Sequence, residues 1–222
     1  MKKIIPKALL KFMTGLIMAG LLLFLPAGSF NYTNAWIFIA VLFIPMLIAG
    51  IVLLFKNPAL LEERLNARET EATQKAVIAV CAVMFIAGFV IAGLNYRFNW
   101  FMLPDPAVYS GSVIFLLSYI MYAEVLRENT YLSRTIKVQQ GQKVIDTGLY
   151  GIVRHPMYSA TVIMFLSIPV ILGSLFSFLV FLIYPFTLVR RIKNEEEVLE
   201  KSLDGYSDYK KRVKYRLIPF IW

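Results

Sequence analysis

Long apolar segments constrain this chain more than any other feature of its sequence. Four of them, residues 8–26, 35–55, 76–94 and 107–126, are 19 to 21 residues long. That is about the length an α-helix needs to cross a bilayer core at ~1.5 Å per residue. Hydrophobic residues make up 59% of the chain and charged residues 17%, whereas soluble domains are about 45–50% apolar and about 25% charged. Lipid is therefore the expected solvent for most of this protein.

A fifth apolar segment, residues 157–189, is too long for one membrane span and short for two. Pro169 and Gly173 lie near its middle, where proline disfavours a continuous helix and glycine permits a tight turn. The pattern predicts a helical hairpin that turns around residues 172–174. The expected fold class is an all-α integral membrane protein with five to six transmembrane helices, according to whether the hairpin crosses completely.

The basic residues predict the orientation of these spans. All of them except Arg97 fall before or near the start of the first span, between the second and third, between the fourth and fifth, or after the hairpin. The positive-inside rule therefore predicts that both termini are cytoplasmic. Attraction to anionic lipid explains the net charge of +9 without nucleic acid. The first span resembles a signal peptide, but its length favours a retained helix.

Two polar segments, residues 127–155 and 190–222, flank the predicted hairpin. Because a hairpin brings its two ends together on one face of the membrane, these segments are expected to meet in space. We therefore divide the chain into an N-terminal part with four spans, residues 1–126, and a C-terminal part, residues 127–222, that contains a cytoplasmic site.

The single histidine of the chain, His155, lies where the first polar segment meets the hairpin. Pro156 disfavours helix at His155 and favours a helix that starts directly after it, with Tyr158 on the first turn. The amino end of such a helix attracts anions. Interfacial anchoring is an alternative interpretation, in which Arg154 extends to the lipid head groups and Tyr158 joins an aromatic belt. These residues alone leave both interpretations open.

In the second polar segment, Arg191 and Glu195 are four positions apart and share a face if the helix continues. They could form a surface ion pair worth about 0.2–0.5 kcal/mol, or a cationic and an anionic group at the mouth of a pocket. The residues beyond them are expected to pack as an aromatic and apolar lid on the interface, namely Tyr206, Tyr209, Val213, Leu217, Ile218, Pro219 and Phe220.

Composition and motif content exclude several chemistries. One histidine and one cysteine, Cys81, cannot supply a zinc site or a disulfide framework. The chain contains no Gly-x-Ser-x-Gly elbow, no Walker loop and no Gly-x-Gly-x-x-Gly, so a hydrolase elbow, a P-loop and a Rossmann site are absent from the sequence. Charged residues are also missing at mid-depth of the predicted spans, which argues against an ion pump or proton relay.

The two polar segments carry motifs in a fixed order. The first reads Gly148-x-Tyr150-x-x-x-Arg154-His155-Pro156-x-Tyr158, and the second, after the hairpin, reads Arg191-x-x-x-Glu195-Glu196-x-x-Leu199. Tyr206-x-x-Tyr209 and Ile218-Pro219-Phe220 follow, and Asn129-Thr130-Tyr131-Leu132-Ser133 and Pro58-Ala59-Leu60-Leu61-x-x-Arg64 precede. Together they resemble the isoprenylcysteine carboxyl methyltransferase family, closely from about Asn129 onward and loosely before it.

The resemblance implies a membrane enzyme that uses S-adenosylmethionine and releases S-adenosylhomocysteine. In that family the C-terminal half holds the cofactor in a cytoplasmic pocket without a Rossmann sheet, and methyl transfer needs no metal. Arg191 would orient the carboxylate of a lipophilic, prenylcysteine-like acceptor, which makes Arg191 and Glu195 the candidate catalytic residues. The cofactor would be bound by Gln142, Lys143, Val144, Ile145, Tyr150, His155, Pro156, Met157, Tyr158 and Glu195.

Departures from the family pattern leave alternatives open. The chain has fewer predicted spans than the eukaryotic enzyme, and Ala160 stands where related phospholipid methyltransferases often carry glycine. Enzymes that methylate carboxylates, lipid amines and small thiols share the motif, so phospholipid-amine or thiol methylation is an alternative. A non-catalytic lipid-binding or assembly protein is another. The expected partners are a lipophilic or prenylated acceptor and membrane lipid, without nucleic acid.

Overall fold

The computed structural model describes residues 4–66, 72–131 and 138–222. Within these ranges the secondary structure is helical, apart from one isolated bridge between Met102 and Ser174. In chain order the helices are α1 (Ile4–Ala27), α2 (Thr33–Lys56), α3 (Pro58–Asn66), α4 (Ala72–Phe98), α5 (Asp105–Glu128), the 3-10 turn η1 (Gly148–Gly151), α6 (Pro156–Ile171), α7 (Leu175–Phe181), α8 (Ile183–Ser202) and α9 (Tyr206–Arg212).

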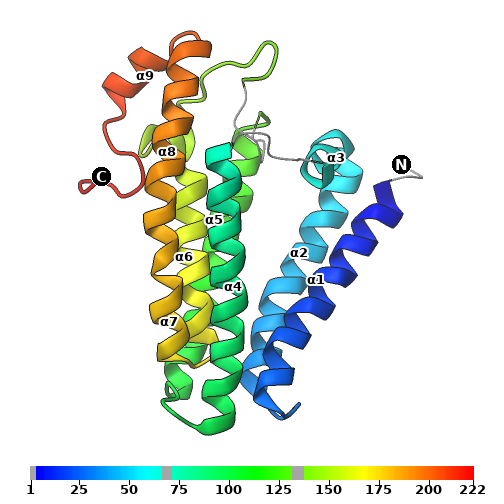
Figure 1. Ribbon diagram of the computed structural model, residues 1–222. Coiled ribbons are helices and arrows are strands. Elements are labelled where there is room, and N and C mark those ends of the chain that lie inside the picture. The colour runs from blue at the N-terminus through cyan, green and yellow to red at the C-terminus, as the bar shows by residue number, and fades with distance from the viewer. Residues whose placement is uncertain (1–3, 67–71, 132–137) are drawn as a thin grey trace.

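Five segments of the described chain are long and apolar enough to cross a membrane: α1, α2, α4, α5 and the α7–α8 segment. Helix α6 is apolar but shorter, with 16 residues. Figure 1 shows α3, α9, the start of α1 and the C-terminal tail at the same end of the bundle. Large apolar side chains point outward along the helices, as with Leu10 (68% exposed) and Phe186 (75% exposed). The prediction of an all-α integral membrane protein with five to six spans is confirmed.

The turn between α6 and α7 lies at the predicted position. Gly173 has a φ of +69°, in the left-handed region that favours glycine, and a Cβ there would lie 2.6 Å from Asn34 Nδ2. Ser174 caps α7, because its hydroxyl oxygen accepts a hydrogen bond from the Ser177 N–H at 3.2 Å. The turn therefore reverses the chain within three residues and returns it to the end of the bundle from which α6 starts.

Aromatic side chains fill the main core between the helices. Phe38, Phe115 and Phe181 are fully buried, and Phe85 packs edge-on against Phe181 with ring centroids 5.3 Å apart. A second, smaller core lies beyond the end of the bundle and connects α8, α9 and the C-terminal tail, residues 213–222. It consists of Leu203, Tyr206, Tyr209 and Val213, packed against Val138, Val144 and Leu199. We call residues 138–155 and 190–222 the head.

Candidate functional site

The two polar segments of the sequence meet through their backbones. The N–H groups of Arg154 and His155 donate to the carbonyl oxygens of Tyr215 and Arg216, each at 2.9 Å. The Ser159 hydroxyl then donates to the carbonyl of Leu217 at 2.6 Å. These bonds hold the C-terminal tail beside the start of α6, so the tail is a structural part of the head.

Arg154 lies at the centre of a buried ion-pair network. Its Nε donates to Glu196 Oε1 at 2.7 Å, and its Nη1 donates to the carbonyl oxygens of Val213 and Lys214 at 2.7 and 2.8 Å. Arg216 Nε reaches the other Glu196 oxygen at 2.8 Å. The side chains of Arg154 and Glu196 are 4% and 3% exposed. Interfacial anchoring is therefore the wrong interpretation of Arg154, which joins α6, α8 and the tail inside the head.

His155 directly precedes α6, with a non-helical φ of −125° and ψ of 61°, as the following Pro156 predicts. Its Nε2 lies 3.3 Å from Glu196 Oε1, and its Nδ1 lies 3.9 Å from Glu195 Oε1. Because a carboxylate only accepts, Nε2 carries the hydrogen in the shorter contact. The imidazole also stacks on the Tyr158 ring, with centroids 5.6 Å apart. Its place between two carboxylates and an aromatic ring makes His155 a wall of the site.

The hydroxyl of Tyr158 connects Arg191 with Glu195. It donates to Glu195 Oε2 at 2.5 Å and accepts from Arg191 Nε at 2.8 Å. On its other side Arg191 donates from Nη1 to Oε1 of Gln74 at 2.9 Å, and Gln74 Nε2 donates to Asn194 Oδ1 at 3.0 Å. Arg191 and Glu195 are therefore organised by α4 and α6 and do not form a simple surface pair.

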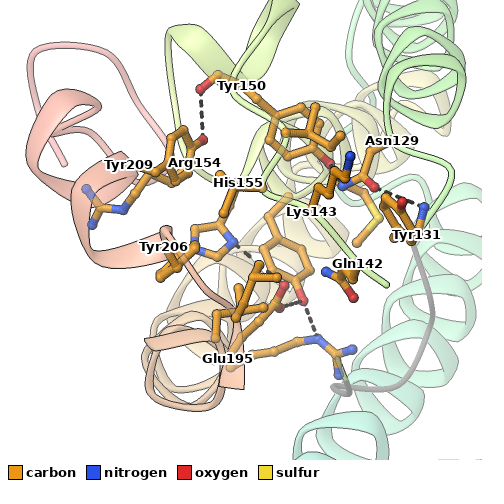
Figure 2. Close-up of a pocket in the computed structure, with 17 residues that line it drawn as sticks. Asn129, Tyr131, Gln142, Lys143, Tyr150, Arg154, His155, Glu195, Tyr206 and Tyr209 are labelled. Atoms are coloured by element: carbon orange, nitrogen blue, oxygen red, sulfur yellow. Dashed lines mark hydrogen bonds and ion pairs between the residues drawn. The ribbon is translucent and has the colours of Figure 1, made fainter. Parts of the chain in front are cut away.

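These side chains face a pocket in the head, which encloses about 840 Å³ of empty space with its open mouth included. Figure 2 shows its residues converging from the segment before α6, from α6 itself and from α8. Pro156 is buried at the first position of α6 and is not among the lining residues. The predicted residues that line the pocket are Gln142, Lys143, Val144, Ile145, Tyr150, His155, Met157, Tyr158, Arg191 and Glu195.

Hydrogen bonds around Tyr150 fix the far wall of the pocket. Asn129 Nδ2 donates to the Tyr150 hydroxyl at 3.0 Å, and the Tyr209 hydroxyl donates to the Tyr150 carbonyl at 2.8 Å. Burial raises the pKa of both tyrosines above the ordinary value. Both hydroxyls therefore stay protonated near pH 7, so that Tyr209 can donate. The neighbouring loop is tied back by Gln139, whose Nε2 donates to the Tyr131 carbonyl at 2.8 Å.

Several residues that line the pocket, or that hold its side chains as Gln74 holds Arg191, are absent from the set predicted from sequence. Gln74 carried no signal, since a single amide at the start of an apolar helix is not distinctive. Tyr206 and Tyr209 were expected only to pack, and Leu132 and Ser133 of the upstream motif lie outside the described residues. The lining residues without a predicted role in the site are Asn129, Tyr131, Leu199, Leu203, Tyr206 and Tyr209, together with the buried Arg154.

The fold and this pocket define a class, an α-helical membrane protein with a polar pocket at one end of its bundle. Residues 111–201 match the model of the isoprenylcysteine carboxyl methyltransferase (ICMT) family. The match runs from within α5 to the end of α8 and includes both main motifs, so the family prediction is confirmed for this segment. The match suggests a membrane methyltransferase.

One relative of this chain is named as a reductase and not as a methyltransferase. The chain is 35% identical over 91 residues to a Delta(14)-sterol reductase of Mus musculus. That similarity covers 40% of this chain and 22% of the reductase, so the matched part spans about a fifth of that relative's length. The segment is therefore similar both to a methyltransferase family and to part of a protein named as a reductase.

Proposed function

We propose that this protein is an S-adenosylmethionine-dependent methyltransferase that esterifies the carboxylate of a lipophilic, prenylcysteine-like acceptor. One observation carries the proposal: the Tyr158 hydroxyl joins Glu195 to Arg191 on the wall of one pocket. Glu195 then offers an anionic group to a cationic cofactor, and the adjacent Arg191 offers a cationic group to an anionic acceptor. Such an arrangement suits a reaction whose rate depends mainly on alignment.

The donor set of the pocket fits the proposed cofactor. Val144, Leu199 and Leu203 supply apolar surface, while Glu195 supplies an acceptor for an ammonium or hydroxyl group. When bound, the cofactor supplies a methyl carbon that forms a bond to a carboxylate oxygen as its bond to sulfur breaks and the electron pair stays on sulfur. Glu195 then binds a polar group of the cofactor, and His155 and Tyr158 form the wall beside it.

Arg191 has the role of orienting the acceptor. A carboxylate is already a nucleophile at pH 7, so this chain needs no general base, and a guanidinium can bind it through two parallel hydrogen bonds. Gln74 and Tyr158 fix the plane of that guanidinium at the pocket wall. Arg191 positions the nucleophile more than it activates it, because complete neutralisation would weaken the attack.

The proposal includes the topology predicted from sequence. Residues 1–126 form the four N-terminal spans and residues 127–222 the catalytic part, with both termini in the cytoplasm. The polar cofactor then reaches the head from water, whereas a lipophilic acceptor approaches from the membrane. Accessibility of single cysteines introduced beside Lys56 and Arg97 to a membrane-impermeant reagent tests the orientation, and labelling of the Arg97 side from the cytoplasm would contradict it.

Isothermal titration of detergent-solubilised protein with S-adenosylhomocysteine tests the cofactor. Binding supports the methyltransferase, and its absence at high micromolar ligand overturns it. A parallel titration with a reduced nicotinamide dinucleotide tests whether this chain instead binds the kind of reducing cofactor that a reductase needs.

Transfer of a labelled methyl group to a farnesylated cysteine analogue, phosphatidylethanolamine and a small thiol then identifies the acceptor. Transfer to the amine or thiol alone would replace the carboxylate with one of the two alternatives.

A further inference from the structure

Tyr206 occupies the first position of α9, on the inner side of the head. Gly205 precedes it with a φ of +82°, a left-handed conformation that turns the chain sharply after α8. The turn drives the Tyr206 side chain into the small core, where it packs with Leu203 and Tyr209 and is 4% exposed. The same residue lines the pocket, beside His155 in Figure 2.

The hydroxyl of Tyr206 has no hydrogen-bond partner. Among the described residues it is the one buried side-chain polar atom left in this state. The neighbouring pocket tyrosines differ, since the hydroxyls of Tyr150, Tyr158 and Tyr209 are all bonded. A buried hydroxyl without a partner destabilises a fold, and native proteins retain few such groups. A ligand that supplies the missing acceptor explains why this one is retained.

The surroundings of Tyr206 define the kind of acceptor it needs. Burial, and then the charge of Glu196, raise the pKa of the hydroxyl above its ordinary value, so it remains a donor at neutral pH. Glu196 disfavours negative charge here more strongly than Arg154 favours it, and Glu195 adds to the effect of Glu196. This balance argues against a ligand carboxylate at this position. Val144 and Leu199 pack against the same small core and line the pocket. The position therefore suits a flat, neutral group that presents an acceptor at its edge.

We infer that the Tyr206 hydroxyl donates a hydrogen bond to the adenosyl half of the cofactor, whose adenine lies on Val144 and Leu199. The inference rests on the proposed function and deepens it, because it fixes the direction of the cofactor in the pocket. The adenosyl half lies toward α9, and the reacting end lies toward Tyr158 and Arg191. Tyr206 is then a cofactor-binding residue contributed by α9, from beyond the end of the family match at residue 201.

Tyr206→Phe removes the hydroxyl and leaves the ring in place. Its affinity for S-adenosylhomocysteine, measured by isothermal titration in detergent, is expected to fall about tenfold, as for the loss of one hydrogen bond to a ligand. The thermal midpoint of the ligand-free variant should be equal to or above that of the wild type, because an unpaired buried hydroxyl has gone. Weaker binding combined with undiminished stability is a result that a merely structural role does not produce.

Tyr215→Phe is the matched control, since Tyr215 lies in the tail that follows α9, packs on Phe220 and is not a pocket residue. It should bind S-adenosylhomocysteine like the wild type. Equal affinity of the wild type and Tyr206→Phe overturns this inference and leaves the proposed function intact, whereas a wild type that binds no S-adenosylhomocysteine overturns the proposed function itself. Repeating the comparison with S-adenosylhomocysteine lacking its carboxylate should give the same fold-loss. A loss that disappears there assigns Tyr206 to the amino-acid half instead.

Discussion

The N-terminal spans and the head are built on opposite principles. In α1 and α2 only 17% of the most apolar window is buried inside the protein, and no charged side chain of these two helices is buried among the described residues. The head instead buries Arg154 and Glu196 and links them to Arg216. Length and apolarity therefore specify the spans, which tolerate many sequences, whereas the head depends on individual polar contacts between segments far apart in the chain.

The largest expected effect comes from breaking the buried network of the head. Glu196→Ala leaves Arg154 without its carboxylate and deprives Arg216 and His155 of the same partner. Removing one member of a buried ion pair costs about 3–5 kcal/mol. We expect the variant to lose most of its folded population in detergent, as measured by thermal unfolding and by size-exclusion chromatography.

Glu124→Ala supplies the comparison for that variant. Glu124 pairs with Arg127 at 2.6 Å, but the two side chains are 45% and 71% exposed. Exposed pairs contribute little to stability because water screens them, so this change should leave the thermal midpoint nearly unaltered. Equal midpoints for the two variants would mean that the buried network does not hold the head together.

The next effect concerns the hairpin turn between α6 and α7, which brings the two polar segments together. Gly173→Ala places a Cβ at 2.6 Å from Asn34 Nδ2 and forces a side chain onto a φ of +69°. Strain of this kind and the close contact together should destabilise the protein by about 2–3 kcal/mol. Gly50→Ala is the control, because its added Cβ meets no atom within 4 Å apart from its chain neighbours and the backbone of its own helix, and alanine favours a helix. Thermal midpoints in detergent should fall for the first variant and stay level or rise for the second.

The fold was more predictable than the site, for a physical reason that particular residues illustrate. The hairpin turn follows from Pro169 and Gly173, whose effects are local. Helix α3 was missed, since its nine residues contain no apolar run of membrane-spanning length. Burial of Arg154 could not be predicted either, because its partners include carbonyl oxygens at residues 213 and 214, about 60 positions away. The predicted hairpin did indicate that the two polar segments would meet in space. It did not indicate which side chains would be buried between them.

Gln74 connects the two regions, and its effect should fall on the site more than on the fold. Gln74→Leu removes the acceptor of Arg191 Nη1 and the donor to Asn194. Under the proposed function, KM for the acceptor should rise about tenfold, the equivalent of one charge-assisted hydrogen bond. Affinity for S-adenosylhomocysteine should hardly change, since Glu195 is untouched.

Gln74→Glu tests whether Gln74 acts through Arg191. The carboxylate still accepts from the guanidinium, so KM should lie closer to the wild type than in Gln74→Leu. An identical rise in KM for both variants, or a loss of cofactor affinity in parallel, would assign Gln74 to packing at the start of α4 alone.

The smallest effect is expected on the outer face of a span. Val83 and Met84 are neighbours on α4, but Val83 is 67% exposed and Met84 is 2% exposed. Lipid tails are as apolar as the valine side chain, and position 83 contacts lipid both before and after the substitution. Val83→Ala should therefore shift the free energy of unfolding by less than about 0.5 kcal/mol. Met84→Ala opens space between packed helices and should cost at least about 1–2 kcal/mol. Unfolding in detergent measures both, and equal losses would show that Val83 faces another protein surface rather than lipid, which would make the spans as dependent on particular contacts as the head.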